Sequence, residues 1–174
     1  MVGPLPSDAT TLIYLAKADG FVDIATSLAG LLASPAVWRE AVIAGEAKHA
    51  PEVERIRAAE RNGLVQRIDL SASTEALAAS IATEHRLGRG ESEVLAVATE
   101  RGSPAVIDEG RAARVAGGLG VRVVSTMFLP VLGFRSLMLE RNDALRLVRR
   151  LGVAAGATAE VLLLVEEELM GEGT

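Results

Sequence analysis

The sequence predicts an α/β fold with a mainly parallel sheet, and the segment from residue 104 to 124 carries the argument. Pro104 to Ile107 is a short apolar run that ends at the acidic pair Asp108-Glu109, which is typical of a buried parallel strand. A helical pattern over 111–116 and a second apolar strand over 121–124 follow. Together they indicate a right-handed parallel crossover. At 174 residues the chain is long enough for one domain, or for one domain with a helical appendage.

The N-terminal region predicts a weak first strand followed by a helix. Pro4 and Pro6 cannot donate to a sheet ladder, so a strand here would be short, irregular or at an edge. Asp8 precedes the apolar run 12–16 and suits the N-cap of a helix, because its carboxylate can accept a backbone N–H of the first turn. Residues 22–32 show a further short helical pattern.

The rest of the chain alternates helical and strand patterns. Ser34 and Pro35 are a cap residue and a proline at the first helical position, so a helix is expected from there to Ile43. The expected elements after it are a helix over 51–61, a strand over 64–68, a helix over 73–86, a glycine turn over 88–90 and a buried helix from 91. From about residue 128 to 170 the pattern is helical, with a break near 152–156.

Composition excludes several kinds of active site. The sequence has no cysteine, which rules out disulfides, thiolate zinc sites and cysteine nucleophiles. It has only two histidines, which argues against a histidine-rich metal site. The glycine turns match neither a phosphate-binding loop nor a dinucleotide-binding fingerprint, and there is no nucleophile elbow. Carboxylates and hydroxyls therefore make up the catalytic inventory.

Charge and hydropathy limit the partners. A net charge of −5 argues against binding nucleic acid through bulk charge, and 3% aromatic residues argue against base-stacking platforms. Arg86, Arg89, Arg111 and Arg114 could form a local phosphate-binding groove, with a solvated helix face as the alternative. No apolar run reaches the ~18 residues of a membrane span, and the N-terminus lacks a secretory signal pattern, so a cytoplasmic location is expected.

Four carboxylates stand out by position: Asp8, Glu40, Glu91 and Asp108. Three of them lie at the ends of expected elements, and Glu40 lies on the side of its helix that also carries apolar residues. Asp108 follows a strand at the sheet edge where α/β proteins bind ligands. An all-oxygen set suits a hard cation such as Mg²⁺ or Mn²⁺. The alternative is that each acid is a helix cap or a surface residue.

Neighbouring acids leave a choice at two of these positions. Glu91 and Glu93 are about 200° apart on a helical wheel, so they cannot both face one site. Glu91 shares a line with Leu95 and Ala98, the more apolar line, and is therefore the predicted inward acid. Glu93 and Glu109 are expected in supporting or surface roles.

Four stretches resemble, in order, the acidic motifs of PIN-domain nucleases. They are Asp8 to Leu15, Pro35 to Glu40, Gly90 to Ala98 and Ile107 to Arg114, and Gly120 to Thr126 resembles the final strand of that fold. The resemblance covers roughly residues 7–140. It is to a prokaryotic PIN-like branch related to toxin ribonucleases, which shares the Gly-Glu motif and the Asp-Glu pair.

The resemblance implies a three-layer α/β/α fold, metal-dependent hydrolysis of RNA, and a toxin role with an antitoxin partner. It places a PIN-like domain at 1–140 and a helical extension at 141–174, which packs on the domain or forms a homodimer. The hypothesis assigns Asp8, Glu40, Glu91 and Asp108 to Mg²⁺ or Mn²⁺. Thr10 or Thr11 would orient a carboxylate or phosphate, and Arg89 or Arg111 would hold the RNA backbone, with Glu93 and Glu109 as alternative acids.

Two other hypotheses remain open from the residues. In the first, the PIN-like fold is a non-catalytic module that binds nucleic acid or a protein. In the second, each acid is a helix cap or a surface residue with a purely structural role. A separation of more than ~10 Å between Asp8, Glu40 and Asp108, too far to share an ion, would support it.

Overall fold

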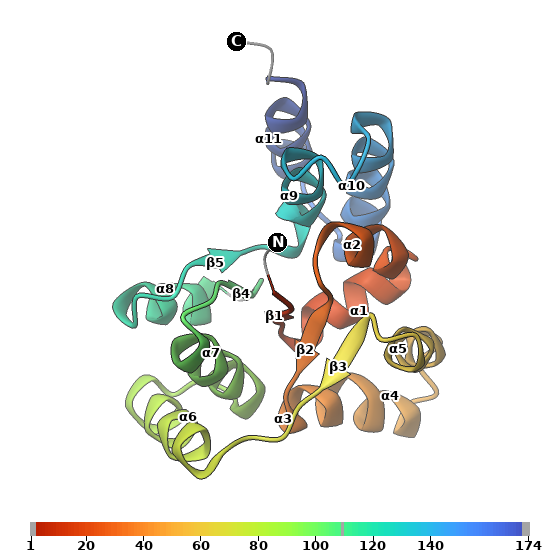
Figure 1. Ribbon diagram of the computed structural model, residues 1–174. Helices are drawn as coiled ribbons and strands as arrows, with labels where there is room; N and C mark the ends of the chain where they lie inside the picture. Colours follow the sequence, from red (N-terminus) through yellow and green to blue (C-terminus); the bar gives the residue numbers. More distant parts are fainter. Residues whose placement is uncertain (1–2, 109, 172–174) are drawn as a thin grey trace.

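The computed structural model describes residues 3–108 and 110–171 and contains a small parallel sheet among many helices (Figure 1). Strands β1 (Leu5–Pro6), β2 (Leu31–Ala33) and β3 (Val65–Arg67) pair in parallel. Strands β4 (Ala105–Val106) and β5 (Val123–Val124) also pair in parallel, and a parallel bridge between Ser7 and Val106 joins the two groups. The strand order is therefore β3-β2-β1-β4-β5. The predicted α/β class with a parallel sheet is confirmed.

The first strand is short, as predicted, but it lies in the middle of the sheet and not at an edge. Leu5 and Ser7 donate their N–H groups to Gly30 and Leu32 on the β2 side, whereas Asp8 donates to Val106 on the β4 side. Successive residues of a strand alternate sides, so the donor that Pro6 lacks would point toward β4. On the β4 side the first backbone hydrogen bond is the one that Asp8, two residues later, donates to Val106. The missing N–H of Pro6 therefore removes no hydrogen bond between the strands.

Helices cover both faces of the sheet (Figure 1). On one face α1 (Ala9–Lys17) packs against α5 (Glu52–Arg61), which also contacts β3. On the other face α7 (Arg89–Arg101) contacts β1 and β4, α8 (Gly110–Gly118) contacts β5, and α6 (Ala72–His85) packs on α7. This arrangement gives the expected helix, sheet and helix layers.

One helix, from residue 35 to 47, has a π-helical turn in its middle. It begins as α3 (Pro35–Trp38), where the Ser34 hydroxyl accepts the Val37 N–H, and continues as the π-helical turn η1 (Arg39–Ile43) and α4 (Ala44–Ala47). A π-helical turn adds a residue to the helix and so changes the direction of the side chains after it; such turns are frequent at functional sites. Glu40 lies in this turn.

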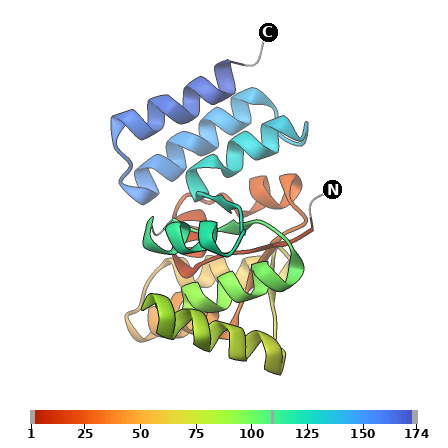
Figure 2. The same ribbon diagram turned by 90° about the vertical axis from the view of Figure 1, so that its left-hand side faces the viewer.

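The C-terminal helices stack at the opposite end of the molecule from α6 and α7 (Figure 2). A 3-10 turn, η2 (Thr126–Phe128), leads into α9 (Leu129–Arg135), α10 (Arg141–Ala155) and α11 (Ala159–Met170). Helix α10 contacts α1 as well as α9 and α11, and α9 contacts α2 (Phe21–Ser27). The boundary near residue 140 and the homodimer stay predictions. In the described part of the chain, no helix is long and apolar enough to cross a membrane.

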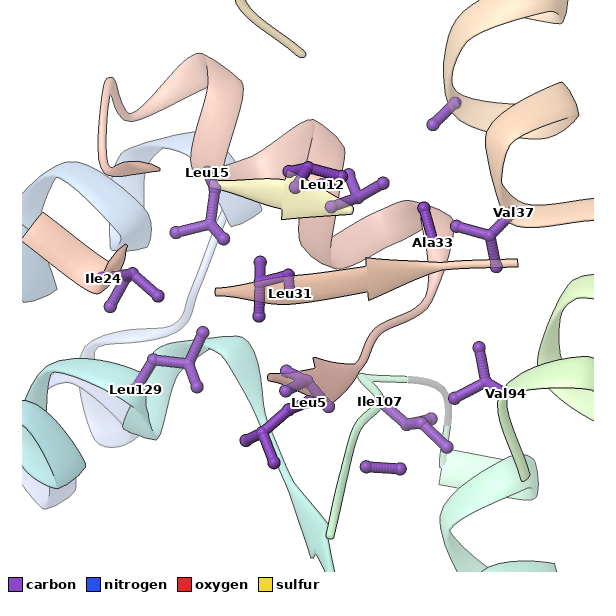
Figure 3. Packing of buried hydrophobic residues seen from close by; sticks show 14 of the residues in the cluster. Leu5, Leu12, Leu15, Ile24, Leu31, Ala33, Val37, Val94, Ile107 and Leu129 are labelled. Atoms are coloured by element: carbon purple, nitrogen blue, oxygen red, sulfur yellow. The ribbon is translucent and has the colours of Figure 1, made fainter. Parts of the chain in front are cut away.

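The hydrophobic core joins these layers and fixes the ends of the strands. Figure 3 shows Leu12 and Leu15 of α1 on one side of Leu31 of β2, with Leu5 of β1 on its other side. All four side chains are at most 1% exposed. This packing positions the residues that follow the strands, including Asp8, at the carboxyl ends of the strands.

Candidate active site

The carboxylate of Asp8 is held between helix α1 and strand β4. Its Oδ1 accepts the Thr11 N–H at 2.7 Å, as an N-cap, and its Oδ2 accepts the Asp108 N–H at 3.1 Å. The residue is 5% exposed, and burial raises the pKa of Asp8 even though the hydrogen bonds from Thr11 and the Asp108 amide lower it. Strands β1 and β4 are the point where the strand order reverses, which is where open α/β sheets bind ligands.

Asp108 is fixed by residues that follow β5. Its Oδ1 accepts the Ser125 hydroxyl at 2.7 Å and the Thr126 N–H at 2.9 Å, and its Oδ2 accepts the Thr126 hydroxyl. Thr126 Oγ1 also lies 2.9 Å from Thr11 Oγ1. A continuous hydrogen-bond network therefore joins the predicted Thr11 to both aspartates across the ends of β1, β4 and β5, so these two acids are neighbours.

Glu40 reaches the site from the π-helical turn. The residue is exposed on the surface, but its carboxylate lies against the start of α7, where it accepts the Gly90 N–H. A Cβ atom at position 90 would lie 2.9 Å from Glu40 Oε2, so glycine permits this close approach. Partial burial raises the pKa of Glu40, and the negative charges of Glu91, Glu93 and Asp8 raise it further.

One cleft of about 370 Å³ is lined by three of the four predicted acids, Asp8, Glu40 and Glu91. Thr10, also a predicted site residue, lines the same cleft. Glu91 is half-buried, and its Oε2 accepts the Gly88 N–H at 2.8 Å, so it also caps α7. Arg86 and Arg111 lie on the same lining, so three acids face two arginines there. The acids repel one another, which is the situation that a bound cation relieves.

The prediction that Glu91 is the more buried of the two α7 acids is wrong. Glu93 is 2% exposed, and its Oε2 accepts the Ala36 N–H at 2.8 Å at the start of α3. Its Oε1 accepts the Nε–H of Arg89 at 2.9 Å. The reason is that α3 covers the side of α7 that carries Glu93, which the apolar pattern of α7 alone cannot reveal. Glu93 thus ties α7 to the helix that carries Glu40.

The predicted arginines occupy different places. Arg111 lines the cleft, whereas Arg89 pairs with Glu93 and lines a separate hollow between α6 and α7. Arg86, which the sequence suggested only as one of several flanking arginines, lines the cleft from the end of α6, where its backbone is left-handed with φ 53°. Its position after a helix and before a glycine turn was the available signal. Glu109 lies outside the described residues.

The four predicted metal ligands form two groups. Asp108 lines a neighbouring hollow next to Ser125 and Phe128, and not the cleft itself. Within residues 3–108 and 110–171, no three acidic or histidine side chains converge closely enough to hold an ion. The donor chemistry nevertheless fits Mg²⁺ or Mn²⁺, because the acids are hard oxygen ligands. The pKa of Glu40 is raised by its partial burial and, to a smaller extent, by the neighbouring negative charges. Glu40 and Glu91 have longer side chains than the aspartates, and each accepts one backbone N–H.

Comparison with known protein families gives one match. A family model described as a PIN domain covers residues 6–164, which is most of the chain. Neither the curated proteins nor the solved structures include a significant match. PIN domains are generally nucleases, and the strand order and the acidic cleft agree with the motifs that suggested this family. The chain therefore belongs to the PIN-domain family of nucleases.

Proposed function

We propose that the protein is a Mg²⁺- or Mn²⁺-dependent ribonuclease that hydrolyses phosphodiester bonds at the cleft between α1, η1 and α7. The observation that supports this most is the gathering of Asp8, Glu40 and Glu91 in one cleft, with the pKa of both Asp8 and Glu40 raised. Carboxylates that share a cleft at a cost in repulsion indicate a function for their charge.

In this proposal Asp8, Glu40, Glu91 and Asp108 hold the cation, directly or through water. The cation, when bound, supplies an activated water and neutralises charge on the transferring phosphoryl group. The residues of the chain orient these ligands. Thr11 donates its backbone N–H to Asp8 and Thr126 donates its backbone N–H to Asp108, and these bonds orient the two carboxylates.

Arg86 and Arg111 are proposed to hold the RNA phosphates that flank the bond to be cleaved, because their guanidinium groups share the cleft with the acids. Contacts of this kind read the backbone and not the bases. Sequence preference is therefore expected to be weak within the cleft. Arg89, which pairs with the buried Glu93, is assigned instead to the support of α7.

The toxin role and the antitoxin partner are part of the same proposal and rest on the family resemblance. A toxin would arrest the growth of a bacterial host on expression, and the Asp8→Asn variant would be tolerated. Growth curves of the two strains at matched expression measure this. Equal growth would leave the nuclease in place and remove the toxin role.

The alternative function is a non-catalytic module that binds RNA. It is favoured by one observation: both oxygens of Asp8 already accept hydrogen bonds, and Glu40 and Glu91 each accept one from a backbone amide. Such a module would bind RNA without cleaving it and would gain no thermal stability from Mn²⁺, whereas a true cation site would gain stability by mass action.

Cleavage of an end-labelled single-stranded RNA, with Mn²⁺, Mg²⁺ or EDTA, separates these functions. We expect cleavage with either cation, none in EDTA, and at least a roughly hundredfold loss of rate in Asp8→Asn. Asp143→Asn, a change at an exposed acid on α10, is the matched control and should cleave normally. Cleavage in EDTA, or full activity of Asp8→Asn, would refute the metal site. Binding without any cleavage would select the alternative.

A further inference from the structure

We propose that a second hollow, beside the cleft, binds the single-stranded RNA that leaves the cleft on the side of β2 and β3. We name it the arginine groove and define it by Arg39, Arg57 and Arg67 with Trp38. The inference rests on the proposed ribonuclease activity and adds to it a binding site for the nucleotides beyond the cleavage point.

The position of the arginine groove relative to the cleft comes from the strand order. The groove is about 700 Å³ and is lined by residues at the ends of β2 and β3, among them Ala33, Arg67 and Ile68. Asp8 and Asp108 follow β1 and β4, so they too lie at the carboxyl ends of the parallel strands. Neighbouring strands are about 4.8 Å apart, so the groove begins roughly 5–10 Å from the end of β1. A strand of RNA bound in the cleft needs only one or two further nucleotides to reach it.

The π-helical turn separates the two hollows. Its first two residues face different ones: Arg39 lines the arginine groove, and Glu40 lines the cleft. RNA that passes from the cleft into the groove therefore crosses this turn. The same turn thus directs the carboxylate of Glu40 to the proposed metal site and the guanidinium of Arg39 to the next phosphates of the RNA.

The two linings differ in their balance of charged groups. The arginine groove has three arginines against Glu60 and Asp69, whereas the cleft has three acids against two arginines. Arg57 is already paired with Glu46, so Arg39 and Arg67, both exposed, are the groups that we assign to RNA. Together they balance the two acids of the groove, on a chain whose net charge is −5.

Arg67 packs over the indole of Trp38. Its guanidinium group lies 4.9 Å from the centroid of the Trp38 ring, and Trp38 is 5% exposed. Arg67 itself is exposed, so the arginine covers the tryptophan on the side of the solvent. A guanidinium plane held in this way can bind a phosphate through two N–H groups or stack on a base, and less side-chain entropy is lost on binding. Single-stranded RNA offers both partners.

The binding test uses a double variant, Arg39→Gln with Arg67→Gln, and a control, Arg101→Gln with Arg122→Gln. The control removes the same charge from exposed arginines at the end of α7 and just before β5, at the opposite edge of the sheet. Fluorescence anisotropy of a labelled ~12-nucleotide single-stranded RNA, titrated at several salt concentrations, measures affinity and its salt dependence. Arg39→Gln alone is the second variant, because it leaves the contact between Arg67 and Trp38 intact.

We expect the double variant to bind on the order of tenfold more weakly and to lose about 1.4 from the slope of log affinity against log salt, at ~0.7 for each lost phosphate contact. Arg39→Gln alone should lose about half of that slope. The control should behave as the unchanged chain. Cleavage of an RNA too short to leave the cleft should be unaffected in both.

Two outcomes would overturn the inference and leave the nuclease intact. One is normal cleavage by the unchanged chain with the double variant equal to the control. The other is an affinity for labelled polyglutamate that falls in the double variant but not in the control, while the affinity for RNA is the same in both; the groove would then be a site for an acidic protein segment. Failure of the unchanged chain to bind or cleave RNA would instead refute the proposed function, and the inference with it.

Discussion

The two aspartates and the two glutamates of the candidate site are held in different ways. Asp8 and Asp108 follow strands, and the four oxygens of their short side chains all accept hydrogen bonds from neighbouring elements. Glu40 and Glu91 lie on helices and reach the cleft through longer side chains, with one bond each to the backbone around Gly88 and Gly90. The two aspartates are therefore held by hydrogen bonds at every oxygen, whereas each glutamate is held by one hydrogen bond to the backbone.

This difference suggests how an acidic site can exist before a cation arrives. The two aspartates fix the position of the site. Because the two glutamates are held less firmly, the four negative charges do not have to converge in the absence of a cation, and their full repulsion is avoided. Each glutamate accepts one backbone N–H in this structure, Glu91 from Gly88 and Glu40 from Gly90. Substitutions at the two pairs should therefore have unequal effects on stability, and the predictions below test this.

The largest effect on stability is expected from Asp8→Ala. The change removes the N-cap of α1 and leaves the Asp108 N–H without its acceptor, which should cost about 1–3 kcal/mol of unfolding free energy. Glu40→Ala, at an exposed residue, should change it by no more than about 0.5 kcal/mol. Urea denaturation followed by circular dichroism measures both. Equal costs would show that the two pairs are held alike.

The next effect, measured on catalysis instead of stability, is expected at Glu93. Glu93→Ala removes the acceptor of the Ala36 N–H and frees the start of the helix that carries Glu40, so kcat should fall roughly tenfold to a hundredfold with little change in KM. Glu93→Gln keeps one oxygen for that N–H and should retain more activity. Steady-state RNA cleavage separates the two constants.

The matched control for Glu93 is Glu100→Ala on the same helix, whose carboxylate accepts the hydroxyls of Ser73 and Thr74 on α6. It tests loss of a helix-to-helix contact that does not involve the start of α3. If Glu93→Gln were as damaging as Glu93→Ala, the charge of Glu93 and not its hydrogen bond to Ala36 would be the important property.

The sequence was sufficient to predict where Asp8 and Asp108 lie relative to the helices and strands. Asp108 follows a short apolar run and Asp8 precedes the apolar run of α1, and both are local patterns. The helix cap read at Asp8 is also present, so the structural and the functional interpretations of this residue describe the same carboxylate.

The rest of the site depends on contacts that are distant in sequence. The partner of Glu93 is 57 residues away, so its burial could not be deduced from the pattern of α7. The helical pattern predicted over 22–32 is wrong at its end, where β2 begins at Leu31, because a three-residue apolar run has no periodicity of its own. The π-helical turn that directs Glu40 and Arg39 to different hollows likewise has no simple sequence signal.

The smallest expected effect is a pH-dependent one at Glu40, measured in EDTA. Its folded pKa is above the ordinary value of 4.5, so between these two values the folded state binds more protons than the unfolded state. The contribution of this group to stability is thus present in acid and is lost as pH rises through the folded pKa. Glu40→Gln does not titrate, so it should gain stability relative to the unchanged chain as pH rises, with the buried Asp8 common to both proteins.

Urea denaturation of both proteins across this pH range gives the difference directly. A relative loss of stability by Glu40→Gln at neutral pH would mean that the hydrogen bond from Gly90 outweighs partial burial and the repulsion from Glu91, Glu93 and Asp8. The charge of Glu40 would then be stabilised by the protein without a cation, and the electrostatic argument for a cation beside Glu40 would be lost.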